Sequence, residues 1–144
     1  MFGAMSEGGQ LLTWAIRHLM IATLARQPVP ISVLRVFEAL GGARLSRALT
    51  SVLLLAARDA DRPLKIHPPC CPELSFDEQG LIAALATAPR GANPTPCGDW
   101  RRLLGTAPST ALLREADVVG ACFRLAGLPI DGFGAAADAY SVPI

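Results

Sequence analysis

The stretch ARLSRALTSVLLLAARD, residues 43–59, shows the clearest helical pattern in this sequence. Its apolar positions recur at the three- and four-residue spacing of one α-helical face: Leu45, Leu49, Val52, Leu53 and Ala56. The opposite face carries charged and polar side chains: Arg44, Arg47, Ser51 and Arg58. The pattern predicts an amphipathic helix packed on a core, and Leu54 and Leu55 widen its apolar side toward an intermolecular contact.

Helical periodicity also dominates the residues before this stretch. Apolar side chains within residues 9–26 cover more than half of the helix circumference, which predicts a helix buried on two sides. Pro30 suits the first turn of a second helix, since no intrahelical partner exists there for the N–H that proline lacks, and this helix should run to Leu40. Gly41 and Gly42 then end or bend it.

A capping box opens the next helix. Ser75 can accept a hydrogen bond from the amide of Glu78, and the Glu78 carboxylate can reach back to the Ser75 amide. Asp77 adds negative charge where the helix dipole favours it. We therefore expect a helix that continues to about Ala88, where Pro89 stops it.

Two further helices are expected in the last third of the chain. Asp99 should cap a short helix over residues 100–104, which Gly105 closes. A longer helix should begin within residues 106–110 and end before Gly127, because glycine suits a left-handed cap.

Together these segments predict an all-α fold, an irregular bundle of five or six helices with an extended Pro/Cys-rich crossover near its middle. A chain of 144 residues suits a single domain, residues 1–144, with one core. We place that core at about residues 9–130 and expect the tail, residues 131–144, to be partly ordered.

The composition is apolar and poor in charge. Hydrophobic residues make up 51% of the chain and charged residues 17%, fewer than is usual in a globular protein. Because few charged side chains remain to cover the surface, the chain should hide an apolar face in a partner, most simply a second copy of itself. We therefore predict a homo-oligomer, in the simplest case a homodimer, that can also bind another protein.

The charge balance argues against nucleic acid as a partner, because a formal net charge of +1 produces no strong field. Residues 1–58 carry six arginines and two glutamates, whereas residues 59–144 carry seven basic and ten acidic side chains. These opposite signs can face each other across a subunit contact. Residues 30–59 have the outline of a helix-turn-helix, but their second helix is too apolar to read bases.

Neither a signal peptide nor a membrane span is expected. Residues 1–7 lack the basic region of a signal peptide. The apolar run from Leu11 to Ala25 contains Arg17 and His18 and is shorter than the about 20 residues that a spanning helix needs. Four cysteines in a chain of this length are not a secreted disulfide framework. These features predict a cytoplasmic protein without a membrane partner.

The run HPPCCP, from His67 to Pro72, is the most distinctive local feature. His67, Cys70, Cys71 and the distant Cys97 are candidate ligands for zinc, which thiolates and imidazoles bind at about 2.0–2.3 Å. Adjacent cysteines suit one metal poorly, because side chains alternate in an extended chain. A redox site near the start of the next helix is another alternative. The simplest interpretation is a proline-stiffened corner with small buried thiols.

Other chemistry-bearing side chains have structural interpretations. His18 has no nucleophile and acid assigned to it, and we expect it to be a partly buried polar side chain. Trp14 and Trp100 are expected to anchor the core or an interface, and Cys122 to lie in the core. The sequence contains no glycine-rich phosphate loop, paired-carboxylate motif or nucleophile elbow, so no catalytic residue or cofactor is predicted.

Four sequence features occur together across residues 11–130. They are Arg17 within a long apolar helix, Pro69-Cys70-Cys71-Pro72 with Ser75 and Glu78 after it, Arg102-Leu103-Leu104-Gly105, and Ala126-Gly127-Leu128-Pro129-Ile130. In these features the chain resembles a small family of sphingomonad-type alphaproteobacterial helical proteins with no assigned activity. The double-cysteine turn is the most specific part. The resemblance implies a bacterial cytoplasmic setting and transfers no functional residue.

The sequence therefore predicts a non-enzymatic helical module that self-associates or binds another protein. The alternative is a Cys-based metal-binding or thiol-redox protein centred on Cys70 and Cys71. Metal content and thiol reactivity distinguish the two.

Overall fold

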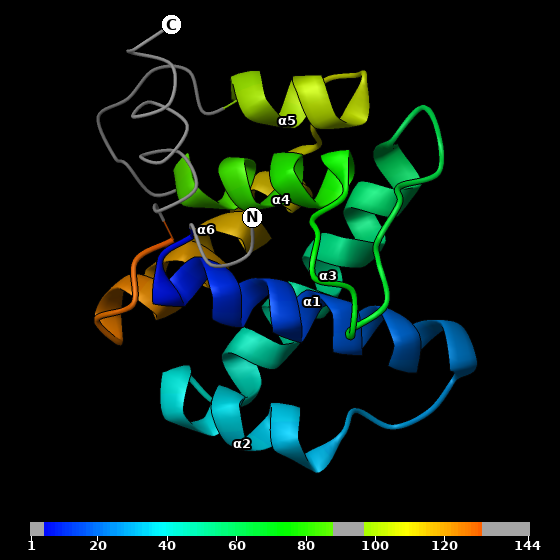
Figure 1. Ribbon diagram of the computed structural model, residues 1–144. Helices are drawn as coiled ribbons and strands as arrows, with labels where there is room; N and C mark the ends of the chain where they lie inside the picture. The colour runs from blue at the N-terminus through cyan, green and yellow to red at the C-terminus, as the bar shows by residue number, and fades with distance from the viewer. Residues whose placement is uncertain (1–4, 88–96, 131–144) are drawn as a thin grey trace, which may run out of the picture.

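Six α-helices form the part of the computed structural model that is described, residues 5–87 and 97–130 (Figure 1). They are α1 (Glu7–Ala25), α2 (Ile31–Leu40), α3 (Ala43–Asp59), α4 (Phe76–Thr87), α5 (Cys97–Leu104) and α6 (Thr110–Leu125). No strand occurs among these residues. The predicted all-α bundle of five or six helices is confirmed.

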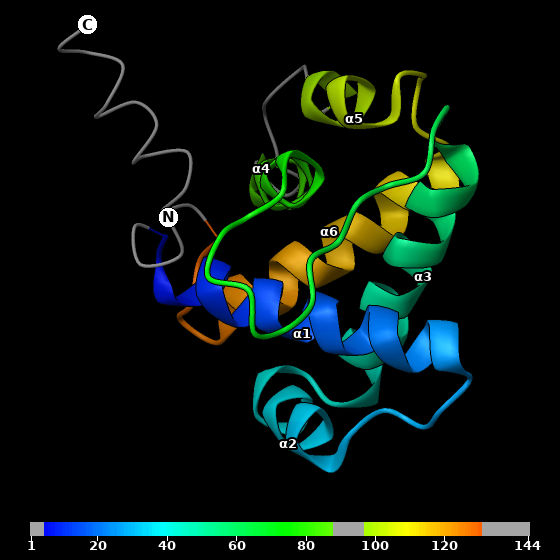
Figure 2. The same ribbon diagram turned by 45° about the vertical axis from the view of Figure 1, so that its right-hand side comes forward.

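The helices pack as an irregular bundle. The most extensive contacts join α3 to α6 and α4 to α5, while α1 touches both α3 and α4. The pair α4 and α5 lies at one end of the bundle and α2 lies at the other, with α1 between them (Figure 1; Figure 2). A single buried cluster draws side chains from all six helices.

The predicted apolar face of residues 43–59 lies in this core. The helix α3 has the predicted bounds, and its five apolar positions are buried: Leu45, Leu49, Val52, Leu53 and Ala56. Leu54 is exposed, as an intermolecular contact would require. Trp100 and Cys122 are also buried, which confirms their assignment to the core.

Most helix ends follow the predicted signals. Pro30 precedes α2, and its carbonyl accepts hydrogen bonds from the amides of Val33 and Leu34, each at 3.1 Å. Gly127 follows α6 with a φ of 77°, a left-handed conformation that glycine adopts without a Cβ clash. The amide of Leu128 then donates to the carbonyl of Phe123 at 2.9 Å and closes the end of α6.

The predicted start of α5 was wrong. The helix begins at Cys97, three residues before Trp100, and Asp99 lies in its first turn instead of capping it. The reason is that negative charge is favourable both at the cap and within the first turn, so Asp99 alone does not determine the boundary. The predicted end is right, because Gly105 follows the helix with a φ of 79°.

The prediction that the first helix is buried on two sides holds only for its first half. Thr13 and Arg17 are buried, but Leu24 in the last turn is 77% exposed and Ile21 is also exposed. Ile31, 66% exposed, and Leu34 are uncovered on the first turn of α2, the next helix along the chain. We call these four aliphatic side chains, Ile21, Leu24, Ile31 and Leu34, the uncovered patch.

The beginning of α1 is joined to the chain that follows α6. The Ser6 hydroxyl accepts from the amide of Gly9 and donates to the carbonyl of Pro129, both at 3.1 Å. A side chain at Gly8 would collide with the main-chain oxygens of Leu128 and Pro129. The predicted tail, residues 131–144, lies outside the described residues.

Within the described ranges, no single helix is both long enough and apolar enough to cross a membrane. The consecutive helices α2 and α3 together reach the required length and hydropathy, but the chain bends by 112° between them.

Candidate functional site

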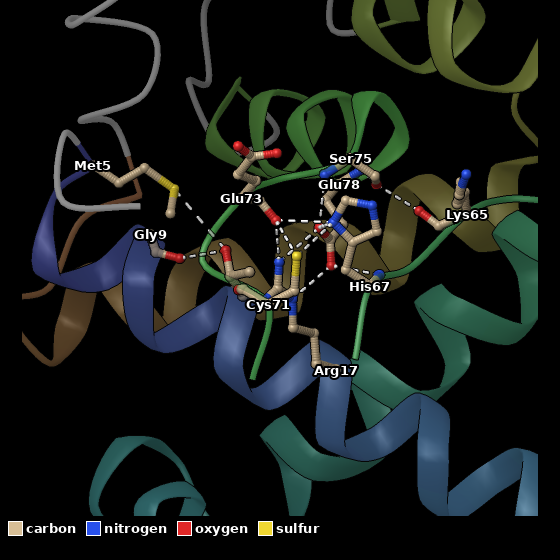
Figure 3. A network of polar contacts seen from close by, with 10 residues as sticks. Met5, Gly9, Arg17, Lys65, His67, Cys71, Glu73, Ser75 and Glu78 are labelled. Atoms are coloured by element: carbon tan, nitrogen blue, oxygen red, sulfur yellow. Dashed lines mark hydrogen bonds and ion pairs between the residues drawn. The ribbon is translucent and has the colours of Figure 1, made fainter. Parts of the chain in front are cut away.

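The crossover, residues 60–75, joins α3 to α4 without forming a helix and passes across α1 (Figure 1; Figure 2). It contains a tight turn, in which the amide of Cys71 donates to the carbonyl of Pro68 at 3.1 Å. The predicted extended crossover is therefore folded back at the double cysteine. This turn places the backbone carbonyls of Cys71 and Glu73 over the middle of α1 (Figure 3).

Arg17 of α1 is the centre of the polar network beneath the crossover (Figure 3). Its Nε and Nη2 donate to the two carboxylate oxygens of Glu78 at 2.7 and 2.9 Å. Its Nη1 donates to the Cys71 carbonyl at 2.7 Å, and Nη2 also donates to the Glu73 carbonyl at 2.8 Å. One guanidinium group thus ties together α1, the crossover and α4.

Glu78 completes the network from the first turn of α4. Its carboxylate accepts from the Ser75 amide at 2.9 Å and from the His67 amide at 3.1 Å. Its own amide donates to the Ser75 hydroxyl at 3.0 Å, which confirms the predicted capping box. The Ser75 hydroxyl in turn donates to the Lys65 carbonyl at 2.5 Å, so the box also holds the crossover.

The Arg17–Glu78 pair is a buried ion pair, with both side chains 1% exposed. Burial tends to raise the pKa of the Glu78 carboxyl, but hydrogen bonds from Arg17 and the Ser75 amide outweigh it and hold the pKa below its usual value. The hydrogen bond to Glu78 raises the pKa of Arg17. A buried charge is tolerated only when it is paired and hydrogen-bonded, and this pair meets both conditions.

Asp77 provides a second anchor for the crossover. Arg62 donates to its two carboxylate oxygens at 2.7 and 2.9 Å, and the Lys65 amide donates to it at 2.7 Å. Burial raises the pKa of Asp77, but the hydrogen bonds from Arg62 and Lys65 prevail and keep that pKa below its usual value. The Arg62 side chain is exposed, so this anchor is the weaker of the two.

His67 and Cys71 meet on the outer side of the network. The Nδ1 atom of His67 lies 2.9 Å from the Glu73 carbonyl oxygen, 3.5 Å from the Cys71 sulfur and 3.7 Å from a Glu78 carboxylate oxygen. Because a carbonyl oxygen only accepts hydrogen bonds, the network assigns the proton to Nδ1. This nitrogen is therefore a donor in the folded protein and has no lone pair to offer a metal.

The structure brings together only part of the predicted zinc set. His67 and Cys71 are neighbours, whereas the Cys70 side chain is exposed and the side chain of Cys97 lies outside the described residues. In the described ranges, no group of three or more His, Cys, Asp or Glu side chains is placed to hold a metal ion. The zinc site stays a prediction for which the structure supplies two neighbouring side chains.

Trp14 and His18 lie on α1 beside α2. Their rings are 5.0 Å apart between centroids and tilted by 60°, and both side chains are half-buried. A groove of about 540 Å³ runs along this flank, lined by Glu7, Gln10, Leu11, Trp14, Val36 and Leu128. The expectation that His18 is a partly buried polar side chain is confirmed.

Sequence reasoning missed the role of Arg17. A charged residue in the middle of an apolar helix is itself a signal, since such a charge must find a partner when the helix is buried. The Glu78 carboxylate was also available as a signal, but the capping box explained it fully. Neither local pattern indicated that the two residues bind each other.

Comparison with known proteins gives no match to a protein-family model, to a curated protein or to a solved structure. The resemblance to a sphingomonad-type family therefore stays a prediction. The fold and the network define an all-α bundle whose crossover is held by a buried arginine.

Proposed function

We propose that this protein is a non-enzymatic helical module of the cytoplasm that self-associates as a homodimer through the uncovered patch. The observation that carries the proposal is the exposure of four large aliphatic side chains on the last turns of α1 and the first turn of α2, two helices that follow each other in the chain. Single exposed apolar residues are common, but a group of this kind favours an interface. The free thiols of Cys70, Cys71 and Cys122 agree with a reducing compartment.

The position of the uncovered patch on α1 supports this proposal. Ile21 and Leu24 follow Arg17 by four and seven residues, so they continue the same side of the helix. The crossover covers this side at Arg17 and leaves it open beyond (Figure 2). A second molecule would cover the last turns of α1 as the crossover covers the middle.

The contact with a second copy of the chain must extend beyond the uncovered patch. A stable interface buries about 800 Å² on each partner, more than four side chains supply. The groove beside Trp14 and Val36 adjoins α1 and α2 as well and would enlarge the contact. Trp14 precedes Ile21 by seven residues, about two helical turns, and so lies on the same side of α1. Aromatic side chains are enriched at the centre of interfaces.

Charge on α2 also favours a second copy. Its exposed side carries one cation, Arg35, and one anion, Glu38, beside Leu34. In an antiparallel pairing of two α2 helices about a two-fold axis, Arg35 of each copy reaches Glu38 of the other. The pairing therefore leaves no net repulsion at the contact.

The polar network supports a structural role for the crossover. All three guanidinium nitrogens of Arg17 and both carboxylate oxygens of Glu78 are engaged with protein groups. An enzyme needs polar groups that face substrate, and this pair faces the protein interior. Stability of the bundle is the effect that this geometry supports best.

Sedimentation velocity over a wide range of concentrations tests the proposal. We expect a concentration-dependent dimer for the unmodified chain and a monomer for the double variant Leu24→Glu/Leu34→Glu, which places charge in the uncovered patch. Leu125→Glu is the matched control, because Leu125 is exposed on α6 outside the patch. A monomer at every concentration for the unmodified chain would refute self-association.

A further inference from the structure

The arginines of this chain are unevenly distributed over the fold. Residues 18–58 carry five arginines and one acidic residue, Glu38. All five arginines are exposed: Arg26, Arg35, Arg44, Arg47 and Arg58. The formal net charge of +1 is an average over the whole chain, and the part built from the end of α1, α2 and α3 is strongly positive.

Three of these arginines share one side of α3. They recur, with two uncharged residues, at the spacing of three and four residues that marks one helical side: Arg44, Arg47, Ser51, Leu54 and Arg58. Ser51 is half-buried and the other four are exposed. We call these five residues the arginine face. Figure 2 shows α3 at the edge of the bundle, where this face is open to a partner.

Most of the charge on the arginine face is uncompensated. Among the described residues, Arg44 and Arg47 take part in no ion pair, whereas Arg58 donates to Asp59 at 2.8 Å. The Arg58 side chain is still 62% exposed and can approach a second anion. A row of exposed guanidinium groups suits a partner with a row of anions, such as the phosphates of a nucleic acid.

The helices α2 and α3 are arranged like a helix-turn-helix. Gly41 and Gly42 connect them, and the chain bends by 112° there. Helix-turn-helix units have angles of about 90–120°, and their second helix enters the major groove of DNA, which is about 12 Å wide. With a rise of about 1.5 Å per residue, Arg47 and Arg58 are about 16 Å apart along α3. The two cationic ends of the arginine face can therefore each approach one of the phosphate strands beside the groove.

We propose that the arginine face binds double-stranded DNA through its backbone phosphates, without reading the base sequence. Phosphate contacts need cations alone, so the apolar character of α3, which excludes base reading, does not oppose such binding. A lipid surface suits this face less, because Leu54 is its one exposed large apolar side chain. Double-stranded RNA also suits it less, because side chains do not enter the deep, narrow major groove of RNA. The arginine face shares no residue with the uncovered patch, so this proposal does not depend on the dimer.

Fluorescence anisotropy of a labelled DNA duplex, titrated with the intact chain, tests the proposal. Each neutralised phosphate adds about −0.9 to the slope of log affinity against log salt, so three arginines give a slope of about −2.7. The affinity should therefore fall about 40-fold between about 50 and 200 mM salt. Duplexes of unrelated sequence should bind equally well. No binding at about 50 mM salt, or binding to one sequence alone, would overturn the proposal.

Two double variants separate the arginine face from the net charge. Arg44→Ala/Arg47→Ala removes two cations from the face, and Arg101→Ala/Arg114→Ala, the matched control, removes two exposed cations from α5 and α6. We expect the first to weaken binding at low salt about tenfold or more and to reduce the steepness of the salt slope by about 1.8, with no change in the control. Equal weakening in both would show that only net charge acts and would overturn the proposal.

Further measurements separate charge from folding and DNA from other polyanions. Arg44→Lys/Arg47→Lys keeps both charges and should bind as the unmodified chain does, and loss of binding in this variant would contradict phosphate neutralisation. Circular dichroism checks that each variant keeps its helices. Vesicles rich in phosphatidylserine and an RNA duplex serve as alternative partners. Tighter binding to either of them than to DNA would assign the arginine face to that partner and overturn the proposal.

Discussion

The middle of α1 and its C-terminal end differ in how the same side of the helix is covered. At Arg17 this side lies under the crossover, and a charged side chain is buried with every guanidinium nitrogen hydrogen-bonded. The crossover does not cover Ile21 and Leu24, and these aliphatic side chains are exposed to solvent. Charge is thus inside and apolar surface outside, the reverse of the usual distribution.

The contrast shows that burial under the crossover, more than residue type, determines how much a side chain of α1 contributes to the stability of the folded chain. A buried charge without its partner is strongly destabilising, because no water replaces the lost hydrogen bonds. An exposed aliphatic side chain contributes less to folding than a core one, because less of its apolar surface leaves water when the chain folds.

The largest effect is expected from Glu78→Gln. This change keeps the shape of the side chain but leaves Arg17 buried without its counter-charge, and the free energy of unfolding should fall by about 3–5 kcal/mol. Urea denaturation followed by circular dichroism measures the loss. Leu24→Ala, at the uncovered end of α1, is the matched control and should change stability by less than about 0.5 kcal/mol.

The double variant Arg17→Met/Glu78→Leu sharpens this prediction. Replacing both charges by apolar side chains of similar size leaves nothing unpaired between them, and such replacements are often neutral. We expect the double variant to be more stable than Glu78→Gln. A greater loss in the double variant would show that the contacts of Arg17 with the crossover carbonyls dominate.

Two consecutive leucines of α3 provide the next comparison. Leu53→Ala should lower the free energy of unfolding by about 2–5 kcal/mol, because Leu53 lies in the core. Leu54→Ala should cost less than about 0.5 kcal/mol in a monomeric chain, because Leu54 is exposed. Equal losses in a urea titration would contradict the assigned face of the helix.

Low pH should destabilise the folded chain through the two carboxylates that hold the crossover, Glu78 and Asp77. Glu78 and Asp77 have folded-state pKa values below their usual ones, so their contribution is complete above the unfolded values of about 4.3 and 3.9. As the pH falls below these values, the unfolded chain takes up protons first, and stability is lost through the lower folded-state pKa values. The urea midpoint should therefore drop between pH 5 and 3, by less than Glu78→Gln lowers it at pH 7. In Glu78→Gln the urea midpoint should fall less steeply with decreasing pH. A fall as steep as that of the unmodified chain would show that protonation of Glu78 does not cause the loss.

The smallest effect is expected from Ser75→Ala. This change removes the hydroxyl that caps α4 and also binds the Lys65 carbonyl, and it should cost about 1–2 kcal/mol. Ser32→Ala is the control, because Ser32 is exposed on α2. A melting temperature of Ser75→Ala equal to that of Ser32→Ala would mean that the capping box is dispensable.

Sequence reasoning succeeded where the interaction is local. Ser75 and Glu78 of the capping box are three positions apart, and the apolar face of α3 lies within one helix of 17 residues, so both appear in the printed sequence as patterns. The Arg17–Glu78 pair joins residues 61 positions apart, and no spacing rule connects them. The start of α5 failed for another reason, since Asp99 is favourable at more than one position of a helix end.

The uncovered patch shows the same limit. The periodicity of residues 9–26 indicates which side of α1 is apolar, but the length of cover depends on where the crossover folds back. The turn formed by Pro68 and Cys71 lies over Arg17, so the crossover covers α1 only near that residue. A sequence pattern predicts that an apolar surface exists, and only the tertiary path of the chain determines which part of it remains open.

The long sequence separations around α1 have a consequence for synthesis on the ribosome. Arg17 is made 61 residues before Glu78, and Ser6 is made 123 residues before Pro129, to which its hydroxyl donates. The polar partners of α1 are therefore made long after the helix itself. During translation the apolar side of α1 can pack on α3, but Arg17 stays without its counter-charge until Glu78 has been made.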